Sequence, residues 1–217
     1  MTTPAGDRPR RGRPRSGEQT ARRRAALDAA LAELLERGVA GTTMQAVATR
    51  AGSSKESLYA WFGNRHGLLA ALIERQAEQV NSAVAQAVDR PADPRTTLVT
   101  IARNLLTLLV GDVSVALNRA AMTSPELAGL VLQHGRHTTG PLVTAFLGRL
   151  ADEGHLRTDD PEEAFQLLYG LVVRDLQIRV LLGERPPGED DIRTQARTAV
   201  GRFLVLTGGW QAPPEDR

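Results

Sequence analysis

The sequence predicts an all-α fold. Apolar residues recur at helical spacing along most of the chain, signals for helix starts are frequent, and no stretch alternates between apolar and polar residues as a half-buried strand does. Hydrophobic residues make up 41% of the 217 residues and aromatic residues only 4%. The core must therefore consist mainly of Leu, Val and Ala, and Leu and Ala are strong helix formers.

Capping signals place the helix starts. Ser16, Thr42 and Ser53 each precede Gln or Glu by three residues, which is the spacing of the capping box. Three further capping residues stand directly before a proline, in Asp93-Pro94, Ser124-Pro125 and Asp160-Pro161. With breaks at glycines and at the loop 185–188, these signals predict about nine to ten helices, at 17–37, 43–50, 54–62, 65–89, 94–110, 112–122, 125–135, 139–153, 161–183 and 189–207.

Charge is distributed unevenly along the chain. Residues 1–67 contain 12 Lys and Arg against 6 Asp and Glu, whereas residues 68–217 contain 15 against 19. A basic N-terminal part on a mildly acidic remainder indicates a polyanionic partner for the N-terminal part alone. Chance clustering is the alternative that charge by itself leaves open.

Several classes of protein are excluded or disfavoured by composition. The absence of cysteine excludes disulfides and thiolate metal sites. The most apolar run, residues 167–173, is too short for a membrane span, so we expect a cytoplasmic protein. The sequence has no G-x-S-x-G, phosphate-loop or H-E-x-x-H motif, and His134-x-x-His137 has no nearby third ligand. We therefore predict no enzyme activity, no cofactor and no metal.

The two short helices at 43–50 and 54–62, joined by a turn that contains Gly52, have the outline of a helix-turn-helix. In that motif the second helix lies in the major groove of DNA. Leu58 and Phe62, four residues apart, are suited to anchoring this helix to a core. The polar-tipped side chains of Lys55, Ser57, Tyr59 and Trp61 then fall on other faces. An ordinary helical hairpin with solvated polar residues is the alternative.

The stretch from Thr42 to Ile73 resembles the DNA-binding domain of the tetracycline-repressor (TetR) family, whose pattern is roughly T-T-x-x-x-I-A-x-x-A-G-V-S-x-x-x-L-Y-x-x-F-x-x-K-x-x-L. The residues that match are Thr42, Thr43, Ala48, Ala51, Gly52, Ser54, Leu58, Tyr59, Phe62 and Leu68, with Val47 and Arg65 as conservative replacements. Two positions depart from the pattern: Ser53 replaces a small apolar residue, and His66 replaces a common acidic one.

The resemblance implies specific contacts with double-stranded DNA. It implies phosphate contacts from Thr43, Tyr59 and Arg65, and base or groove contacts from Ser54, Lys55, Ser57 and Trp61. An Arg-rich arm at residues 1–16, which we expect to be disordered, precedes the motif. Its Arg-Gly-Arg-Pro core resembles an AT-hook, so Arg11 and Arg13 are candidates for insertion into the minor groove. A solubilising basic tail is the alternative.

The resemblance also implies a domain order: the arm at 1–16, a helix-turn-helix domain at 17–67, a helical ligand-binding and dimerisation domain at 68–210, and a flexible tail at 211–217. Polar or adaptable residues within apolar helices are candidates for a ligand pocket, namely Asn104, Asn118, Met122, Phe146 and Tyr169. Surplus apolar surface in the last two helices predicts a homodimer interface that contains Leu168, Leu176, Val180, Ala196, Val200, Phe203 and Leu204. An intramolecular core is the alternative for these seven residues.

The sequence thus predicts a DNA-binding transcriptional regulator, a dimeric repressor that a small-molecule effector releases from a pseudo-palindromic operator. Three alternatives remain open at this stage. The first is an activator or a ligand-independent regulator of the same family. The second is a non-specific architectural DNA binder. The third is a small-molecule-binding dimer with a vestigial DNA domain.

Overall fold

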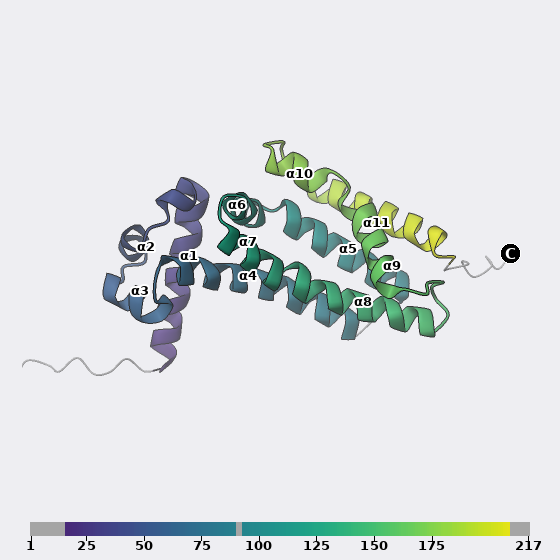
Figure 1. The fold of residues 1–217 in the computed structure, drawn as a ribbon, viewed down its shortest axis with the longest axis horizontal. Coiled ribbons are helices and arrows are strands. Elements are labelled where there is room, and N and C mark those ends of the chain that lie inside the picture. The colour runs from purple at the N-terminus through teal and green to yellow at the C-terminus, as the bar shows by residue number, and fades with distance from the viewer. Residues whose placement is uncertain (1–15, 90–92, 209–217) are drawn as a thin grey trace, which may run out of the picture.

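The computed structural model describes residues 16–89 and 93–208, and within these residues it contains eleven helices and no strand. The helices are α1 (Ser16–Gly41), α2 (Met44–Arg50), α3 (Lys55–Phe62), α4 (Arg65–Asp89), α5 (Pro94–Val110), α6 (Asp112–Ala121), α7 (Pro125–His134), α8 (Arg136–Asp152), α9 (Pro161–Val173), α10 (Leu176–Leu181) and α11 (Glu189–Leu206). Figure 1 shows α1, α2 and α3 gathered at one end of an elongated molecule, with α4 extending from them along the remainder. The predicted all-α fold is confirmed.

The caps of α2 and α3 lie one residue later than the capping boxes predict. Thr43 and Ser54, not Thr42 and Ser53, accept hydrogen bonds from the backbone N–H of Ala46 and Ser57, each at 3.1 Å. Thr42 is buried, and its hydroxyl donates to the carbonyl of Gly38 at 2.9 Å, so this side chain is turned away from the start of α2. The three predicted starts before proline are confirmed, because the side chains of Asp93, Ser124 and Asp160 all accept bonds from the first turn.

The helix predicted at 161–183 is divided in two. α9 ends at Val173, and Arg174 adopts a left-handed backbone conformation with φ of 50° before α10 begins at Leu176. The end of α10 is held by α6, because the guanidinium of Arg119 donates to the carbonyls of Val180 and Leu181, both at 3.0 Å. Apolar periodicity continues across the break without Gly or Pro, which is why the sequence indicated one helix.

Two clusters of buried apolar side chains stabilise the fold. The N-terminal cluster joins α1, α2 and α3 to the first half of α4 and to residues of α6 and α7 such as Leu117 and Leu127. The body cluster joins the second half of α4, from Val84 onward, to α5, α8, α9 and α11. The division between the two clusters thus runs through α4 and α6 and does not follow one cut in the sequence.

An ion-pair cluster fixes α2 against α1. Glu33 of α1 is only 3% exposed, and its carboxylate lies 2.7 Å from Nε of Arg50 and 3.3 Å from Nη1 of Arg37. Arg50 also pairs with the carboxylate of Glu36, with Nη1 to Oε1 at 2.8 Å. The hydrogen bond from Arg50 lowers the pKa of Glu36. Arg50 is thus the link between the last turn of α2 and two carboxylates of α1.

We predict that Arg50→Gln lowers the melting temperature by roughly 3–6 °C, because it leaves the buried Glu33 carboxylate without its nearest cation. The double variant Glu33→Gln/Arg50→Gln should melt above the single variant Arg50→Gln, since it removes the unpaired charge as well. Arg103→Gln on α5, an exposed position, is the matched control. Since Glu36 has a lowered pKa when folded, its pairing stabilises the fold above the ordinary Glu pKa and is lost as the pH falls through the lowered value. Strictly additive effects of the two substitutions would contradict the prediction.

Candidate functional site

The helix α3 presents a distinct outer face. Leu58 and Phe62 are buried in the N-terminal cluster, as the sequence predicts, so the helix is fixed from beneath. Lys55 and Tyr59 are exposed on the remaining surface. At the start of the helix the hydroxyls of Ser54 and Ser57 lie 3.1 Å apart and are hydrogen-bonded to each other. These side chains form a polar edge at the N-terminus of α3, which is the end of a recognition helix that faces DNA bases.

Two other expected contact residues are partly occupied by structural roles. The Trp61 ring is half-buried against the N-terminal cluster and meets the Phe62 ring edge-on, with centroids 6.3 Å apart. Thr43 is exposed, but its hydroxyl oxygen caps α2. Trp61 and Thr43 therefore stabilise the helix-turn-helix in addition to lying at its surface.

Arg65 joins the start of α4 to the end of α1. Its Nε donates to the carbonyl of Thr42 at 2.8 Å, and its Nη2 donates to the carbonyl of Val39. The last carbonyls of a helix lack partners within the helix and need donors from elsewhere. The half-buried guanidinium donates to both carbonyls here, of which that of Val39 also accepts from the backbone N–H of Thr42, so Arg65 holds the end of α1 against the start of α4.

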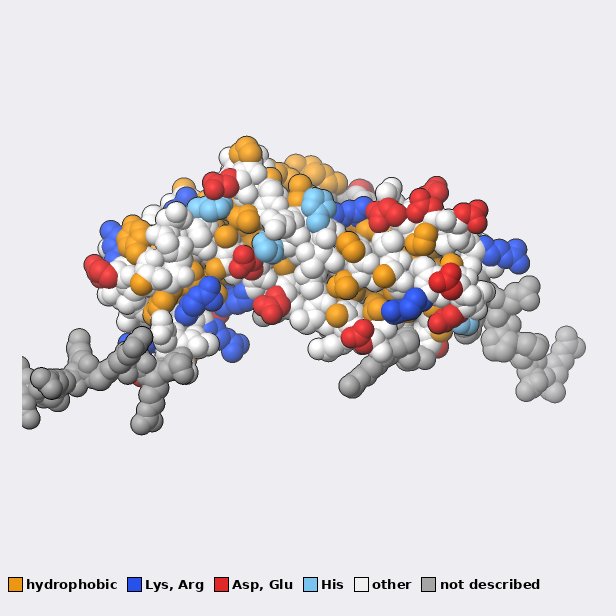
Figure 2. Space-filling model, turned by 60° about the horizontal axis from the view of Figure 1, so that its bottom comes forward, with side chains coloured by type: hydrophobic (Ala, Val, Ile, Leu, Met, Phe, Trp, Pro, Cys, Tyr) orange, Lys and Arg blue, Asp and Glu red, His pale blue; other side chains and the backbone are white. Residues whose placement is uncertain are grey.

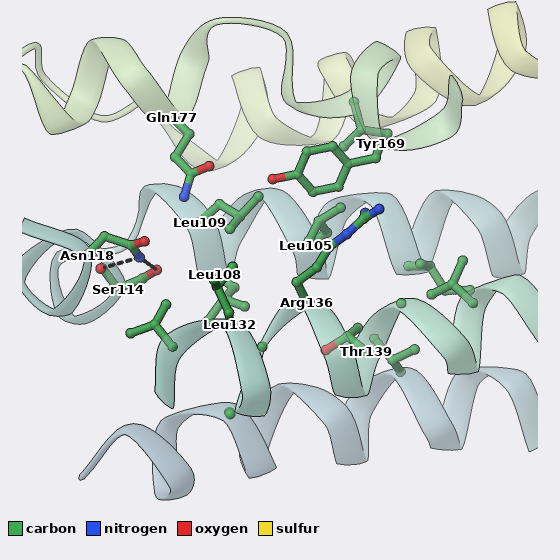
Figure 3. A pocket seen from close by; sticks show the side chains of 18 of the residues that line it. Leu105, Leu108, Leu109, Ser114, Asn118, Leu132, Arg136, Thr139, Tyr169 and Gln177 are labelled. Carbon is green, nitrogen blue, oxygen red and sulfur yellow. Dashed lines mark hydrogen bonds between the residues drawn. The ribbon is translucent and has the colours of Figure 1, made fainter. Parts of the chain in front are cut away.

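A second candidate site is a cavity of about 730 Å³ within the body, a volume suited to a small organic ligand. It lies among α4, α5, α6, α7, α8, α9 and α10. Most of its lining is aliphatic, including Leu105, Leu108 and Leu109 of α5 (Figure 3). The exposed lining residues, Leu132 of α7 and Gln166 of α9, mark the side that opens to solvent.

A few polar groups interrupt this apolar lining. Asn118 donates from Nδ2 to the carbonyl of Ser114 at 2.8 Å (Figure 3). This hydrogen bond fixes the orientation of the Asn118 amide. Gln177 extends from α10, and Tyr169 from α9, on the opposite side of the cavity (Figure 3). Burial raises the pKa of Tyr169, although the nearby Arg136 charge lowers it in part. The phenol therefore remains a hydrogen-bond donor at neutral pH.

Comparisons with known families decide what these two sites belong to. Residues 26–72 match the family described as "Bacterial regulatory proteins, tetR family". Residues 96–206, half of the chain, match the family described as "AefR-like transcriptional repressor, C-terminal domain".

The chain belongs to the TetR family of transcriptional regulators.

Solved structures agree with this assignment. A TetR transcriptional regulator from Agrobacterium tumefaciens is 38% identical, with a TM-score of 0.67 over 85% of this chain and 93% of that chain. The flavonoid-responsive regulator FrrA is 28% identical, with a TM-score of 0.66 over 86% of this chain and 97% of that chain. A putative TetR-family regulator from Mesorhizobium loti, 21% identical, shares the fold with a TM-score of 0.77 over 87% of this chain and 97% of that chain. No curated protein matches the sequence significantly.

The cavity of this TetR-family chain contains two of the five residues expected from the sequence. Asn118 and Tyr169 line it, whereas Asn104, Met122 and Phe146 do not. Met122 is 65% exposed just beyond α6, and Phe146 is fully buried in the body cluster. Sequence reasoning missed several lining residues, namely Gln76, Arg136, Thr139 and Gln177. Gln76, Arg136 and Thr139 stand in polar stretches that resemble solvated helix faces, so no sequence pattern distinguished them. Gln177 is a polar residue among apolar ones, a signal that could have identified it.

The seven residues expected at the dimer interface face the interior instead. Leu168, Val180, Ala196, Val200, Phe203 and Leu204 are all buried within the body cluster, and Leu176 packs against it. Their side chains pack within the chain itself, which is the intramolecular alternative. The apolar surplus of these helices is therefore used mainly to join α5, α9 and α11.

The remaining expectations concern the arm and other site types. Arg11 and Arg13 lie outside the described residues, as does the tail 211–217. Within residues 16–89 and 93–208, no group of three or more His, Asp or Glu is arranged to hold a metal. No single helix there is long and apolar enough to cross a membrane, although the bent pair α5 and α6 together satisfies length and composition.

The space-filling view in Figure 2 shows acidic side chains gathered at the end of the molecule away from α1, α2 and α3.

We predict that Arg65→Met destabilises the helix-turn-helix by about 1–3 kcal/mol, because the carbonyl of Thr42 loses its side-chain donor and that of Val39 keeps only the backbone N–H of Thr42. Chemical denaturation followed by circular dichroism measures this loss. Arg65→Lys should recover only part of the stability, since one ammonium cannot reproduce the fork of the guanidinium. Wild-type stability in Arg65→Met would show that the side chain has no bracing role.

Proposed function

We propose that the chain is a homodimeric repressor that binds a pseudo-palindromic DNA operator and leaves it when a small molecule fills the body cavity. Regulation, not catalysis, is then its activity. The observation that carries this proposal is that the cavity shares residues with the N-terminal cluster, in which α3 is anchored. Ile73 of α4 and Leu117 of α6 line the cavity and also belong to the N-terminal cluster.

This sharing gives a direct mechanical route from effector to DNA. A ligand that presses on Ile73 and Leu117 displaces α4 and α6 relative to α1, because close-packed side chains transmit displacement. A second route runs through Thr139, which lines the cavity and bonds to Asn81 of α4. In a symmetric dimer such movements change the spacing between the two α3 helices, which must match one turn of DNA. The relative FrrA is described as flavonoid-responsive, which supports a small-molecule effector here.

The DNA-contacting face that we propose consists of the α3 N-terminus and its neighbours. In this proposal Lys55 and Ser57, in the first turn of α3, read bases, whereas Thr43, Tyr59 and Arg65 serve phosphate contact or positioning. Ser54 and Trp61 complete the groove-facing set. Arg11 and Arg13 extend the contact into the minor groove, and residues 1–15 hold five arginines against one aspartate.

The dimer face that we propose is the outer side of α9 and α11. Of the nine large hydrophobic residues exposed in the described part of the chain, five lie on or next to α9, α10 and α11: Leu167, Ile178, Leu182, Val205 and Leu206. Small residues Thr194, Thr198 and Gly201 accompany Val205 at helical spacing on α11. A Cβ atom added at Gly201 would meet nothing within 4 Å. The surface therefore permits close approach of a second copy.

We predict that Lys55→Ala relaxes preference at one position of the operator and costs roughly 1–3 kcal/mol in binding to the preferred sequence. Ser57→Ala should act at a neighbouring position. Sequencing of fragments selected from random duplexes by the purified full-length protein measures both effects. Arg103→Gln, far from α3 in the body, should select the wild-type operator. If Arg65→Ala alters the selected sequence while both α3 variants leave it intact, the assignment of roles is wrong. Uniform coating of all duplexes by the wild type would contradict operator binding itself.

We predict that light scattering gives about twice the chain mass of 23.4 kDa, and that Val205→Glu reduces it to one chain mass. Val205 is 79% exposed, so a charge there leaves the single chain folded but disrupts an apolar contact between copies. Leu35→Glu, on the exposed side of α1, is the matched control and should remain dimeric. Val200→Glu should instead unfold the chain, because Val200 is fully buried. A dimeric Val205→Glu variant would place the interface elsewhere.

A further inference from the structure

The cavity contains one charged side chain. Among the residues that line it, Arg136 is the only Arg, Lys, Asp or Glu. Arg136 is the first residue of α8, and its side chain extends along the cavity toward Tyr169 (Figure 3). The cavity therefore combines an aliphatic interior with a single unit of positive charge.

The guanidinium of Arg136 is held in place from one side. Its Cζ lies 4.6 Å from the ring centroid of Phe165 and 5.6 Å from that of Tyr169, both on α9. Stacking on rings fixes the plane of a guanidinium while leaving the N–H groups at its edge available. The rings thus orient Arg136 for binding an acceptor in its plane.

The existing acidic partner of Arg136 occupies little of its hydrogen-bonding capacity. Nη2 donates to Oε1 of Glu162 at 3.3 Å, which is long for a charge-assisted bond. Both side chains are more than one third exposed, so water weakens this pair. Glu162 also accepts a bond from the hydroxyl of Thr144 at 2.9 Å, so it has a second partner of its own. An anion that enters the cavity can therefore displace Glu162 from Arg136.

The position of Arg136 gives a ligand its direction. Arg136 is four residues from the exposed lining residue Leu132, across the junction of α7 and α8, and its own side chain is 36% exposed. An acidic group bound by Arg136 therefore lies near the opening, and the apolar body of the molecule extends inward toward Leu105 and Leu117. The Tyr169 phenol adds a neutral donor beside the cation. A cationic ligand is disfavoured, because no carboxylate lines the cavity to pair with it.

We propose that the effector of this cavity is an apolar organic monoanion, of which a hydrophobic carboxylic acid is the simplest kind, with its acidic group bound by Arg136. This inference rests on the proposed function, since it specifies the ligand that releases the DNA. Arg136 selects for the charge, and the aliphatic walls select for the apolar body. Glu162 pairs with Arg136 when no acidic ligand is bound, and it therefore weakens binding of the acid by competing for the guanidinium.

The test compares acids with neutral molecules of the same shape. Calorimetric titration of the full-length protein uses decanoate against 1-decanol, and 2-naphthoate against 2-naphthalenemethanol. At least one acid should bind about tenfold tighter than its alcohol, the difference expected from one or two bonds to a charged group. Arg136→Gln should abolish that preference while leaving the affinity for the alcohol unchanged, and Arg136→Lys should restore it in part.

Glu162→Gln provides the opposite change. It should tighten binding of the acid a few-fold without affecting the alcohol, because it removes the competing carboxylate. Arg103→Gln, exposed on α5 and outside the cavity, is the matched control and should behave as wild type. A general loss of packing would weaken acid and alcohol alike in all variants, so opposite effects at Arg136 and Glu162 distinguish recognition from structural damage.

Two results would overturn the inference: neither acid binds, or both alcohols bind as tightly as their acids. The same titrations in the presence of the selected operator separate this failure from failure of the proposed function. Release of the operator by an alcohol would contradict only the charge preference. Absence of sequence-selective DNA binding without any added ligand would contradict the proposed function itself.

Discussion

The structure depends on the packing of one continuous helix, α4, into two apolar clusters. Its first half, from Leu68 to Ile73, is buried with α1, α2 and α3, and its second half, from Val84 to Val88, is buried with α5 and α8. Neither half can shift without disturbing a close-packed set of neighbours. The helix therefore fixes the helix-turn-helix to the body, and α6 and α7 strengthen the joint by contributing Leu117 and Leu127 to the N-terminal cluster. The pairing of Arg65 with the end of α1 completes the connection.

Local chemistry made most of the fold predictable from the sequence. Proline after a capping residue located three helix starts, because both preferences are properties of a few adjacent residues. The capping boxes placed two starts one residue early, since Thr42 satisfies its hydroxyl within the end of α1 instead of at the start of α2. The break at Arg174 had no local signal, because the contacts that hold α10, from Arg119 to its last carbonyls, join residues some sixty positions apart.

The sites were predictable to different degrees for the same reason. A helix-turn-helix is a short contiguous pattern, so the buried anchors Leu58 and Phe62 and the exposed Lys55 could be identified from spacing. The cavity draws residues from seven helices, and Arg136 acquires its meaning only from the rings of Phe165 and Tyr169. The apolar stripes on the last helices predicted a subunit interface, with an intramolecular core as the alternative, because periodicity does not say which neighbour covers a stripe. Val200 and Phe203 pack within the chain itself.

The break at Arg174 separates two roles that one longer helix would have combined. α9 is packed on both α8 and α11 and is therefore constrained along its length, whereas the six residues of α10 place Gln177 on the cavity and pack Val180, with Leu176 and Leu181, against the body cluster. A substitution at the partly buried Gln177 changes the lining of the cavity without removing an apolar contact between α9 and α11. The break therefore places one polar residue of the cavity on a segment that is separate from α9 and α11, the two helices that form the framework of the body.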